Sequence, residues 1–300
     1  MFADLFFVSI LFIGLITATY TDIKRREVPD WINYFLIALG LGGHLIISIT
    51  QQSIYPILLS LCVAFIFFIV ANILFYSGSW GGGDAKFLVA VGALLPTYPE
   101  TLLKVLTPAL ASWPFILTLF FNIILFGAII GIIFTFYSIA KNYKKVKKNL
   151  NKLMKKPIVK ISRIILIISV LPLIFGIIKQ VPHIRFLTIL WLTIIFFFYI
   201  VLLSKASENI SMLKKVKPSD LTEGDWIAED VKVNNKIVYK KRRIGIEKKY
   251  IKLLKNLESE GKLNSVKIKE GLPFLPSFLL GIIFTLIVGD IMFICLSTLI

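Results

Sequence analysis

Long apolar runs are the feature that most limits what this chain can fold into. Several stretches near twenty residues long contain no charged side chain, for example 54–76 and 114–140. Runs of that length match the hydrocarbon thickness of a bilayer. With 57% hydrophobic residues and a mean hydropathy of +0.84, the chain is predicted to be an integral membrane protein without a large water-soluble core.

The placement of charge predicts the topology. We expect eight membrane spans, at about 5–20, 31–48, 54–76, 85–97, 114–140, 164–178, 186–203 and 273–297. With the N-terminus outside, 31 of the 34 Lys and Arg residues fall on the cytoplasmic side, as the positive-inside rule requires. The predicted fold is therefore an all-α polytopic bundle in the plasma membrane with a small cytoplasmic α+β cap.

The chain is expected to have five parts. They are a catalytic transmembrane core at 1–140, a basic cytoplasmic linker at 141–163, additional transmembrane helices at 164–203, the cap at 204–272 and a C-terminal transmembrane helix at 273–300. The linker has ten basic residues and no acid, which is typical of a topology anchor that also contacts anionic lipid. Since the net charge of +17 gathers at one membrane face, we predict the lipid bilayer as a partner and no nucleic acid.

The cap has readable local patterns. Residues Trp226 to Val233 and Ile237 to Tyr239 are predicted to form a hairpin around Asn234 and Asn235. An amphipathic helix is expected from Glu247 to Glu260, and a third strand from Val266 to Ile268.

Two acidic residues are the candidates for chemistry. Asp22 closes the first span, and Asp84 follows Gly81, Gly82 and Gly83 at the start of the short fourth span, so the topology puts both on the cytoplasmic face. A carboxylate at a membrane edge is costly and marks a candidate functional site, although Asp22 alone also fits an ordinary interfacial charge. The consecutive glycines favour a sharp turn or the close approach of another segment, including a substrate strand.

Two facing aspartates make a particular reaction available. Two close carboxylates share one proton near neutral pH, because both do not ionise easily. One deprotonates a water as it attacks a peptide carbonyl that the other polarises, which is aspartic protease chemistry. This chemistry needs no cofactor. We also predict no metal site, because Cys62 and Cys295 lie in apolar runs and the chain has only two histidines.

The same residues resemble a known family. The string 81–84 matches the GxGD signature of membrane-embedded aspartic peptidases, and 83–88 looks like its prepilin peptidase version. Segment 21–29 resembles that family's first-aspartate segment, while 223–231 and 268–276 are similar to the cap of its archaeal branch, the preflagellin and pilin peptidases. The resemblance implies cleavage of a short basic leader from prepilin-like or preflagellin-like precursors, with Asp22 and Asp84 as the catalytic pair.

The resemblance also has departures. Bacterial relatives carry a cysteine-rich insert and a methyltransferase activity, but this chain has no CxxC motif, so peptidase activity alone is predicted. Asp30 adds a third carboxylate where relatives often have Asn. Because the inner face is strongly basic, acidic residues are the better candidates to contact a basic leader. These candidate contacts are Asp30, Asp225, Glu229 and Asp230.

Two alternatives stay open at this point. A presenilin-like or signal-peptide-peptidase-like protease shares the GxGD signature and has a Pro-Ala-Leu tripeptide, which occurs here at 108–110. An ion- or proton-coupled transporter would use Asp22 and Asp84 to bind a cation or proton, although the two halves show no inverted repeat. The sequence leaves open whether the precursors are archaellins or pilins, and the oligomeric state.

Overall fold

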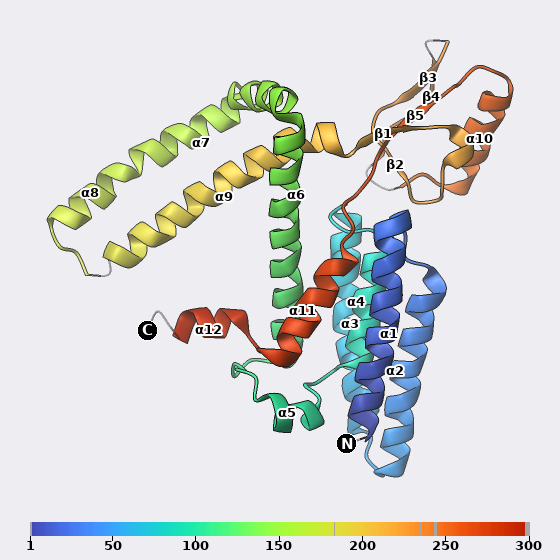
Figure 1. The fold of residues 1–300 in the computed structure, drawn as a ribbon, viewed down its shortest axis with the longest axis vertical. Coiled ribbons are helices and arrows are strands. Elements are labelled where there is room, and N and C mark those ends of the chain that lie inside the picture. Colours follow the sequence, from blue (N-terminus) through green and yellow to red (C-terminus); the bar gives the residue numbers. More distant parts are fainter. Residues whose placement is uncertain (1, 183, 235, 243–244, 298–300) are drawn as a thin grey trace. The chain divides into compact units, whose positions relative to one another are not determined.

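The computed structural model describes residues 2–182, 184–234, 236–242 and 245–297, and the chain divides into two compact units. The first unit comprises Met1–Ile129 and Lys214–Ile300, and the second comprises Ile130–Leu213. Each unit is described by itself (Figure 1).

Four helices form the bundle of the first unit. They are α1 (Phe2–Arg25), α2 (Asp30–Thr50), α3 (Tyr55–Tyr76) and α4 (Gly82–Leu94). The short helix α4 lies at the centre, and its side chains from Phe87 to Leu94 are largely buried. Small residues make this packing possible, because a Cβ on Gly40 of α2 would meet the backbone of Ala93, and one on Gly92 would meet Val63 and Phe67 of α3.

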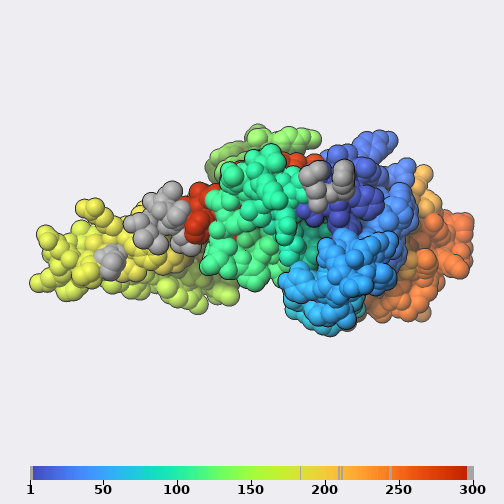
Figure 2. All heavy atoms as spheres, turned by 90° about the horizontal axis from the view of Figure 1, so that it is seen from below, coloured from blue at the N-terminus to red at the C-terminus, as the bar shows by residue number. Residues whose placement is uncertain are grey.

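The first unit contains further helices. These are α5 (Glu100–Leu106), the beginning of α6 (Phe115–Met154), α11 (Leu275–Ile287) and α12 (Ile291–Ser297). Helix α11 packs against α1 and α5, and its Gly281 lies against the backbone of Ile123 in α6. Asp4 near the start of α1 accepts hydrogen bonds from the backbone N–H and the hydroxyl of Thr101 in α5. Figure 2 shows the segment after α4, in green, beside the start of α1 at this end of the bundle.

The polytopic helical fold with a small cap is confirmed. Among the described residues, six helices are long and apolar enough to cross a membrane. They correspond to six of the eight predicted spans. The other two, α4 and α11, have 13 residues each, a rise of about 20 Å.

The last span differs from the prediction of one helix over 273–297. Helix α11 ends at Ile287, the chain turns at Gly289, and α12 begins at Ile291. Gly289 has φ of +102° and pairs with Ala109 as an isolated parallel bridge, which a residue with a side chain would not fit. The Asp290 carboxylate accepts the backbone N–H of Phe293, so Asp290 caps a new helix.

The cap folds as two small sheets and a helix, as the sequence predicts for an α+β unit. Its elements are β1 (Leu213–Val216), the 3-10 turn η1 (Pro218–Asp220), β2 (Trp226–Ile227), β3 (Val231–Val233), β4 (Lys236–Tyr239), α10 (Lys248–Ser259) and β5 (Val266–Lys269). The predicted helix and third strand are confirmed as α10 and β5. Strands β3 and β4 form the predicted hairpin, whose turn residue Asn235 lies outside the described residues.

One part of the predicted hairpin is wrong. The stretch from Trp226 to Val233 is not one strand, because β2 pairs with β5 in a sheet of order β1-β5-β2, while β3 pairs with β4. The two strands still share one hydrophobic core, in which Ile227, Val231 and Leu254 are buried.

The regular structure of the second unit is helical among its described residues up to Ser211. It contains α6 from residue 130 onward, α7 (Pro157–Ile168), α8 (Val170–Ile178) and α9 (Ile184–Ser211). Helices α8 and α9 pack together, and the indole N–H of Trp191 donates to the hydroxyl of Ser169. Helix α6 has a break in its helical geometry at Asn142.

Candidate active site

Asp22 lies one turn before the end of α1, where the sequence changes from apolar to basic. The helix ends as Arg26 takes a positive φ of 58° and Pro29 leads into α2. The Asp22 side chain is buried, with 6% of its surface exposed. One carboxylate oxygen, Oδ2, accepts a hydrogen bond of 2.9 Å from the backbone N–H of Leu275.

Leu275 is the first residue of α11, so Asp22 lies at the N-terminus of a helix from the far end of the chain. The first N–H groups of a helix have no partner within it, and its dipole is positive at that end. Both effects stabilise a negative charge. The contact therefore favours the ionised form of Asp22 inside an otherwise apolar bundle.

An aromatic cluster holds the start of α11 in place. The ring of Trp80 lies 4.8 Å from that of Phe274 and 5.5 Å from that of Phe278, and Phe278 meets Phe87 edge to face at 5.6 Å. Trp80 directly precedes the glycines, and Phe274 directly precedes α11. The loop that leads to Asp84 and the helix end that binds Asp22 are thus packed on each other.

Asp84 is the third residue of α4 and is half-buried. Its Oδ2 accepts a hydrogen bond of 3.2 Å from the backbone N–H of Gly81, which caps the helix. A Cβ added to Gly83 would lie 2.8 Å from Cβ of Val28, which follows Asp22 by six residues. The absence of a side chain at Gly83 therefore lets the two aspartate segments touch.

The structure brings Asp22 and Asp84 to the same end of the bundle. The charge of Asp22 acts on Asp84, and α1 and α4 are in contact. Two carboxylates whose charges interact can share one proton. Such a pair is a candidate for acid and base catalysis.

Asp30 does not join this pair. Its Oδ1 lies 2.6 Å from Nζ of Lys86, and both side chains are partly exposed. Because Lys86 comes two residues after Asp84, the ion pair ties the start of α2 to the start of α4. The third carboxylate noted in the sequence is therefore neutralised by a cation.

The acidic residues of the cap lie in two settings. Asp225 accepts the backbone N–H of Thr222 at 2.9 Å, and the hydroxyl of Thr222 donates to Glu27, in the connection between α1 and α2, at 2.6 Å. Burial raises the pKa of Asp225, and the charges of Glu27 and Glu270 raise it further. Asp225 thus lies where the cap meets the bundle.

The other two acids are engaged within the cap. The Glu229 carboxylate forms an ion pair of 2.9 Å with Lys267, and Asp230 accepts the backbone N–H of Lys241 at 2.7 Å. Among the residues that the structure describes, neither Glu229 nor Asp230 contacts Asp22 or Asp84. Of the three candidate leader contacts in the cap, Asp225 is the one that lies beside the α1 to α2 connection.

A mostly apolar groove lies between α3 and α4, near the start of α4. It has a volume of about 190 Å³, and Gly82, Ala85, Lys86 and Val89 of α4 line it together with Asn72 of α3. Asn72 is half-buried in an otherwise apolar stretch of α3, and its amide N–H donates to Phe68 of the same helix. A second apolar groove, of about 240 Å³, lies between α1 and α2 and includes Ile13 and Thr17.

Sequence reasoning missed Phe274, Leu275 and Trp80. The predicted topology places the start of the last span on the same face as Asp22, so the sequence indicates that the two could be close. It does not indicate which of the other spans the start of the last span contacts. As for metals, no group of three or more His, Cys, Asp or Glu side chains gathers among the described residues.

Comparison with known proteins gives matches to the part of the chain that carries both aspartates. Residues 9–136, which contain both aspartates, match the model of the type IV leader peptidase family. The chain is 34% identical over 134 residues to a preflagellin peptidase of Methanococcus voltae, covering 43% of this chain and 55% of that protein. It is 31% identical over 129 residues to the prepilin peptidase EppA of Methanothermobacter thermautotrophicus, covering 42% of this chain and 34% of that protein.

The matched region spans about half or less of each of these relatives. No solved structure gives a significant match to this chain. Within that extent, the resemblance of the two aspartate segments is confirmed, and residues 9–136 of this chain are similar to the type IV leader peptidase family.

Proposed function

We propose that this chain is an aspartic endopeptidase of the membrane that removes the basic leader from prepilin-like or preflagellin-like precursors. The observation that carries the proposal is the pair of carboxylates, one from the end of α1 and one from the start of α4, whose charges interact at one end of the bundle. The similarity of residues 9–136 to leader peptidases supports the same activity.

The two aspartates have different surroundings, and this suggests their roles. Asp22 accepts a short hydrogen bond from the N-terminus of α11, so it is the anion that removes a proton from the water. Asp84 has one longer hydrogen bond, from Gly81, and lies in the field of Asp22, so it keeps the shared proton and donates it to the peptide carbonyl oxygen. The resulting tetrahedral intermediate collapses as Asp22 passes its proton to the leaving amine and Asp84 recovers one from the hydroxyl.

The groove between α3 and α4 is the proposed path for the apolar segment that follows the cleaved bond. Its lining by Gly82 and Ala85 places it at the first turns of α4, the helix that carries Asp84, and its mostly apolar walls suit an apolar peptide. The basic leader would then reach toward Asp225 and Glu27, where carboxylates gather on the cap side. We propose that this side faces the cytoplasm, because the basic residues predict that orientation.

Processing of a precursor by the purified chain in vesicles tests the proposal. Asp22→Asn and Asp84→Asn should each lower the cleavage rate by at least about a hundredfold, because acid or base catalysis contributes roughly that factor or more. The matched control is Asp30→Asn, which removes one negative charge from a carboxylate that is paired with Lys86 rather than with the aspartate pair, and it should leave the rate within a few fold. Cleavage at the wild-type rate by either Asn variant of the pair would rule out the assignment.

The presenilin-like alternative predicts a different cleavage position. The Pro-Ala-Leu tripeptide at 108–110 lies by Gly289, after the end of α11, whereas Asp22 lies at its start. The tripeptide is thus about 20 Å along the helix from the aspartates. Mass spectrometry of the product should show cleavage at the leader boundary rather than within the apolar segment.

A further inference from the structure

The lysine-rich stretch of the second unit lies between two candidate membrane spans, so it is expected at a membrane surface. It separates the apolar part of α6 from the next candidate span, Pro157–Ile178. Two successive spans cross the bilayer in opposite directions, so the residues that join them lie at one face. The break at Asn142, with φ of −129° and ψ of 33°, changes the direction of the helix, and Figure 1 shows α6 bending near this end.

The helix after this break has two unlike faces. Val146 is buried, and Asn149, Leu150, Leu153 and Met154 are half-buried along the same side. Asn149 donates its amide N–H to the backbone oxygen of Ala206 in α9 at 3.3 Å. The lysines between these positions are exposed, so the helix presents its charge away from the side on which Asn149 contacts α9.

The positive charge of this helix has no acidic counterpart nearby in the sequence. Ten Lys and Arg residues occur in 141–163, and Glu208 is the one acidic residue of the second unit. Among the described residues, no ion pair is formed by a lysine of this stretch. Its charge is therefore available to an anionic partner.

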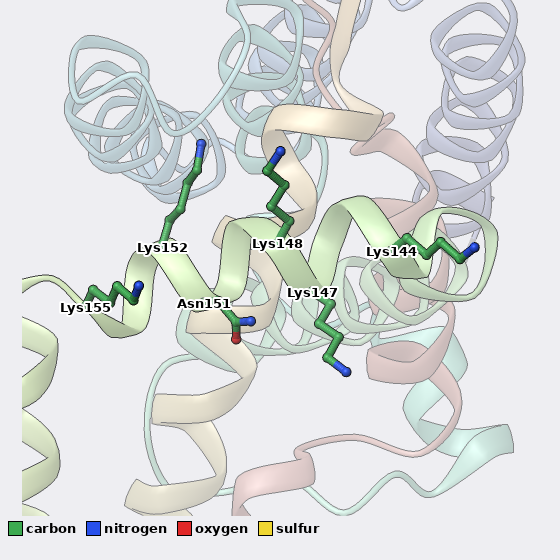
Figure 3. A pocket seen from close by; sticks show the side chains of 6 residues that line it. All are labelled: Lys144, Lys147, Lys148, Asn151, Lys152 and Lys155. Atoms are coloured by element: carbon green, nitrogen blue, oxygen red, sulfur yellow. The ribbon is translucent and has the colours of Figure 1, made fainter.

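The geometry of the lysines indicates which kind of partner fits. Six side chains line an open hollow of about 400 Å³, namely Lys144, Lys147, Lys148, Asn151, Lys152 and Lys155. Figure 3 shows that the lysine side chains point in different directions from one helix and do not converge on a single point. A compact soluble anion would need converging groups, whereas several separate phosphates fit this spread.

We propose that the segment from Tyr143 to Lys156, which comprises the last part of α6 and the turn after it and is here called the lysine helix, binds the phosphate headgroups of anionic lipids at the bilayer surface. The partner follows from the position between two spans, from the unpaired positive charge and from the spread of the side chains. This inference does not depend on the proposed peptidase activity. It assigns the second unit a lipid-selective surface of its own.

Lipid retention tests this inference. The full chain is purified from vesicles of equal parts phosphatidylglycerol and phosphatidylcholine, and the lipids kept by the protein are counted by native mass spectrometry. The wild-type chain should retain phosphatidylglycerol in several-fold excess. The quadruple variant Lys144→Gln, Lys147→Gln, Lys148→Gln and Lys152→Gln should retain the two lipids almost equally. A second variant with Arg at the same four positions keeps the positive charge and should show the wild-type excess.

A matched control separates this surface from net charge. Lys236, Lys240, Lys252 and Lys255 are exposed cap lysines without ion pairs among the described residues, and their substitution by Gln should leave the excess unchanged. If the quadruple variant does not fold, the pair Lys147→Gln and Lys152→Gln should lose about half of the excess. The proposal is overturned if the lysine-helix variants keep the wild-type excess, if the cap variant loses it equally, or if free inorganic phosphate abolishes it.

Discussion

At the scale of single residues, the three glycines before Asp84 have unequal roles. A Cβ on Gly83 would lie 2.8 Å from Cβ of Val28, whereas the nearest atom to one on Gly82 is in the ring of Phe75 at 3.6 Å, an ordinary contact. Gly83→Ala should therefore destabilise the fold by about 1–3 kcal/mol through overpacking and slow processing. Gly82→Ala is the matched control for stability and should leave the thermal midpoint unchanged, whereas an equal loss of stability in the two variants would contradict this account.

Asp225 gives a pH-dependent prediction at the same scale. Its pKa in the folded chain is raised by burial and by Glu27 and Glu270, so its favourable contribution is complete below the ordinary pKa of an aspartate and is lost as pH rises through the folded value. At neutral pH the charged side chain is thus a net cost. Asp225→Asn should raise the thermal midpoint at pH 7 and leave it unchanged at pH 3. A gain of the same size at both values would mean that the charge is not the cause.

At the scale of elements, the start of α11 is the support of the site. Trp80 packs on Phe274 and Phe278, and Leu275 between them binds Asp22. Trp80→Ala removes a buried aromatic ring and should destabilise by about 3–5 kcal/mol, with a fall in kcat that exceeds the change in KM. Trp80→Phe keeps an aromatic ring and should recover most of kcat. A wild-type kcat in a folded Trp80→Ala variant would show that α11 is not needed to position Asp22.

The contrast between these elements explains what sequence patterns predict. The placement of Asp22 and Asp84 at one end of the bundle was predictable. Asp22 closes one apolar run, Asp84 opens another, and counting the spans puts both on one face. The contact of Asp22 with Leu275 joins residues 253 positions apart, and nothing in the local pattern of either segment specifies it. The end of α11 at Ile287 and the turn at Gly289 were likewise missed, because the apolar run continues and the bridge from Gly289 to Ala109 is a tertiary contact.

At the scale of the whole molecule, the candidate chemistry belongs to one unit. Both aspartates, the start of α11 and the cap lie in the first unit, while the second contains Glu208 as its one acidic residue. The match to leader peptidases ends at residue 136, close to where the second unit begins. The sequence predicts that the helices of 164–203 are additional to a catalytic core. The division into units suggests a test, in which these helices are deleted and the activity of the rest is measured.

Excision of residues 157–204 should leave an active peptidase. The excision removes two candidate spans almost entirely, so the cap and α11 stay on their original side of the membrane. A short Gly-Ser linker should close the gap, because Asn149 donates a hydrogen bond to Ala206 across it. Precursor cleavage in vesicles should stay within a few fold of the wild-type rate.

The matched control removes residues 157–181 alone, which deletes one span. The cap and the start of α11 then lie on the opposite side of the membrane, and cleavage should be abolished. If the two-span deletion folds but is inactive, the second unit takes part in the reaction.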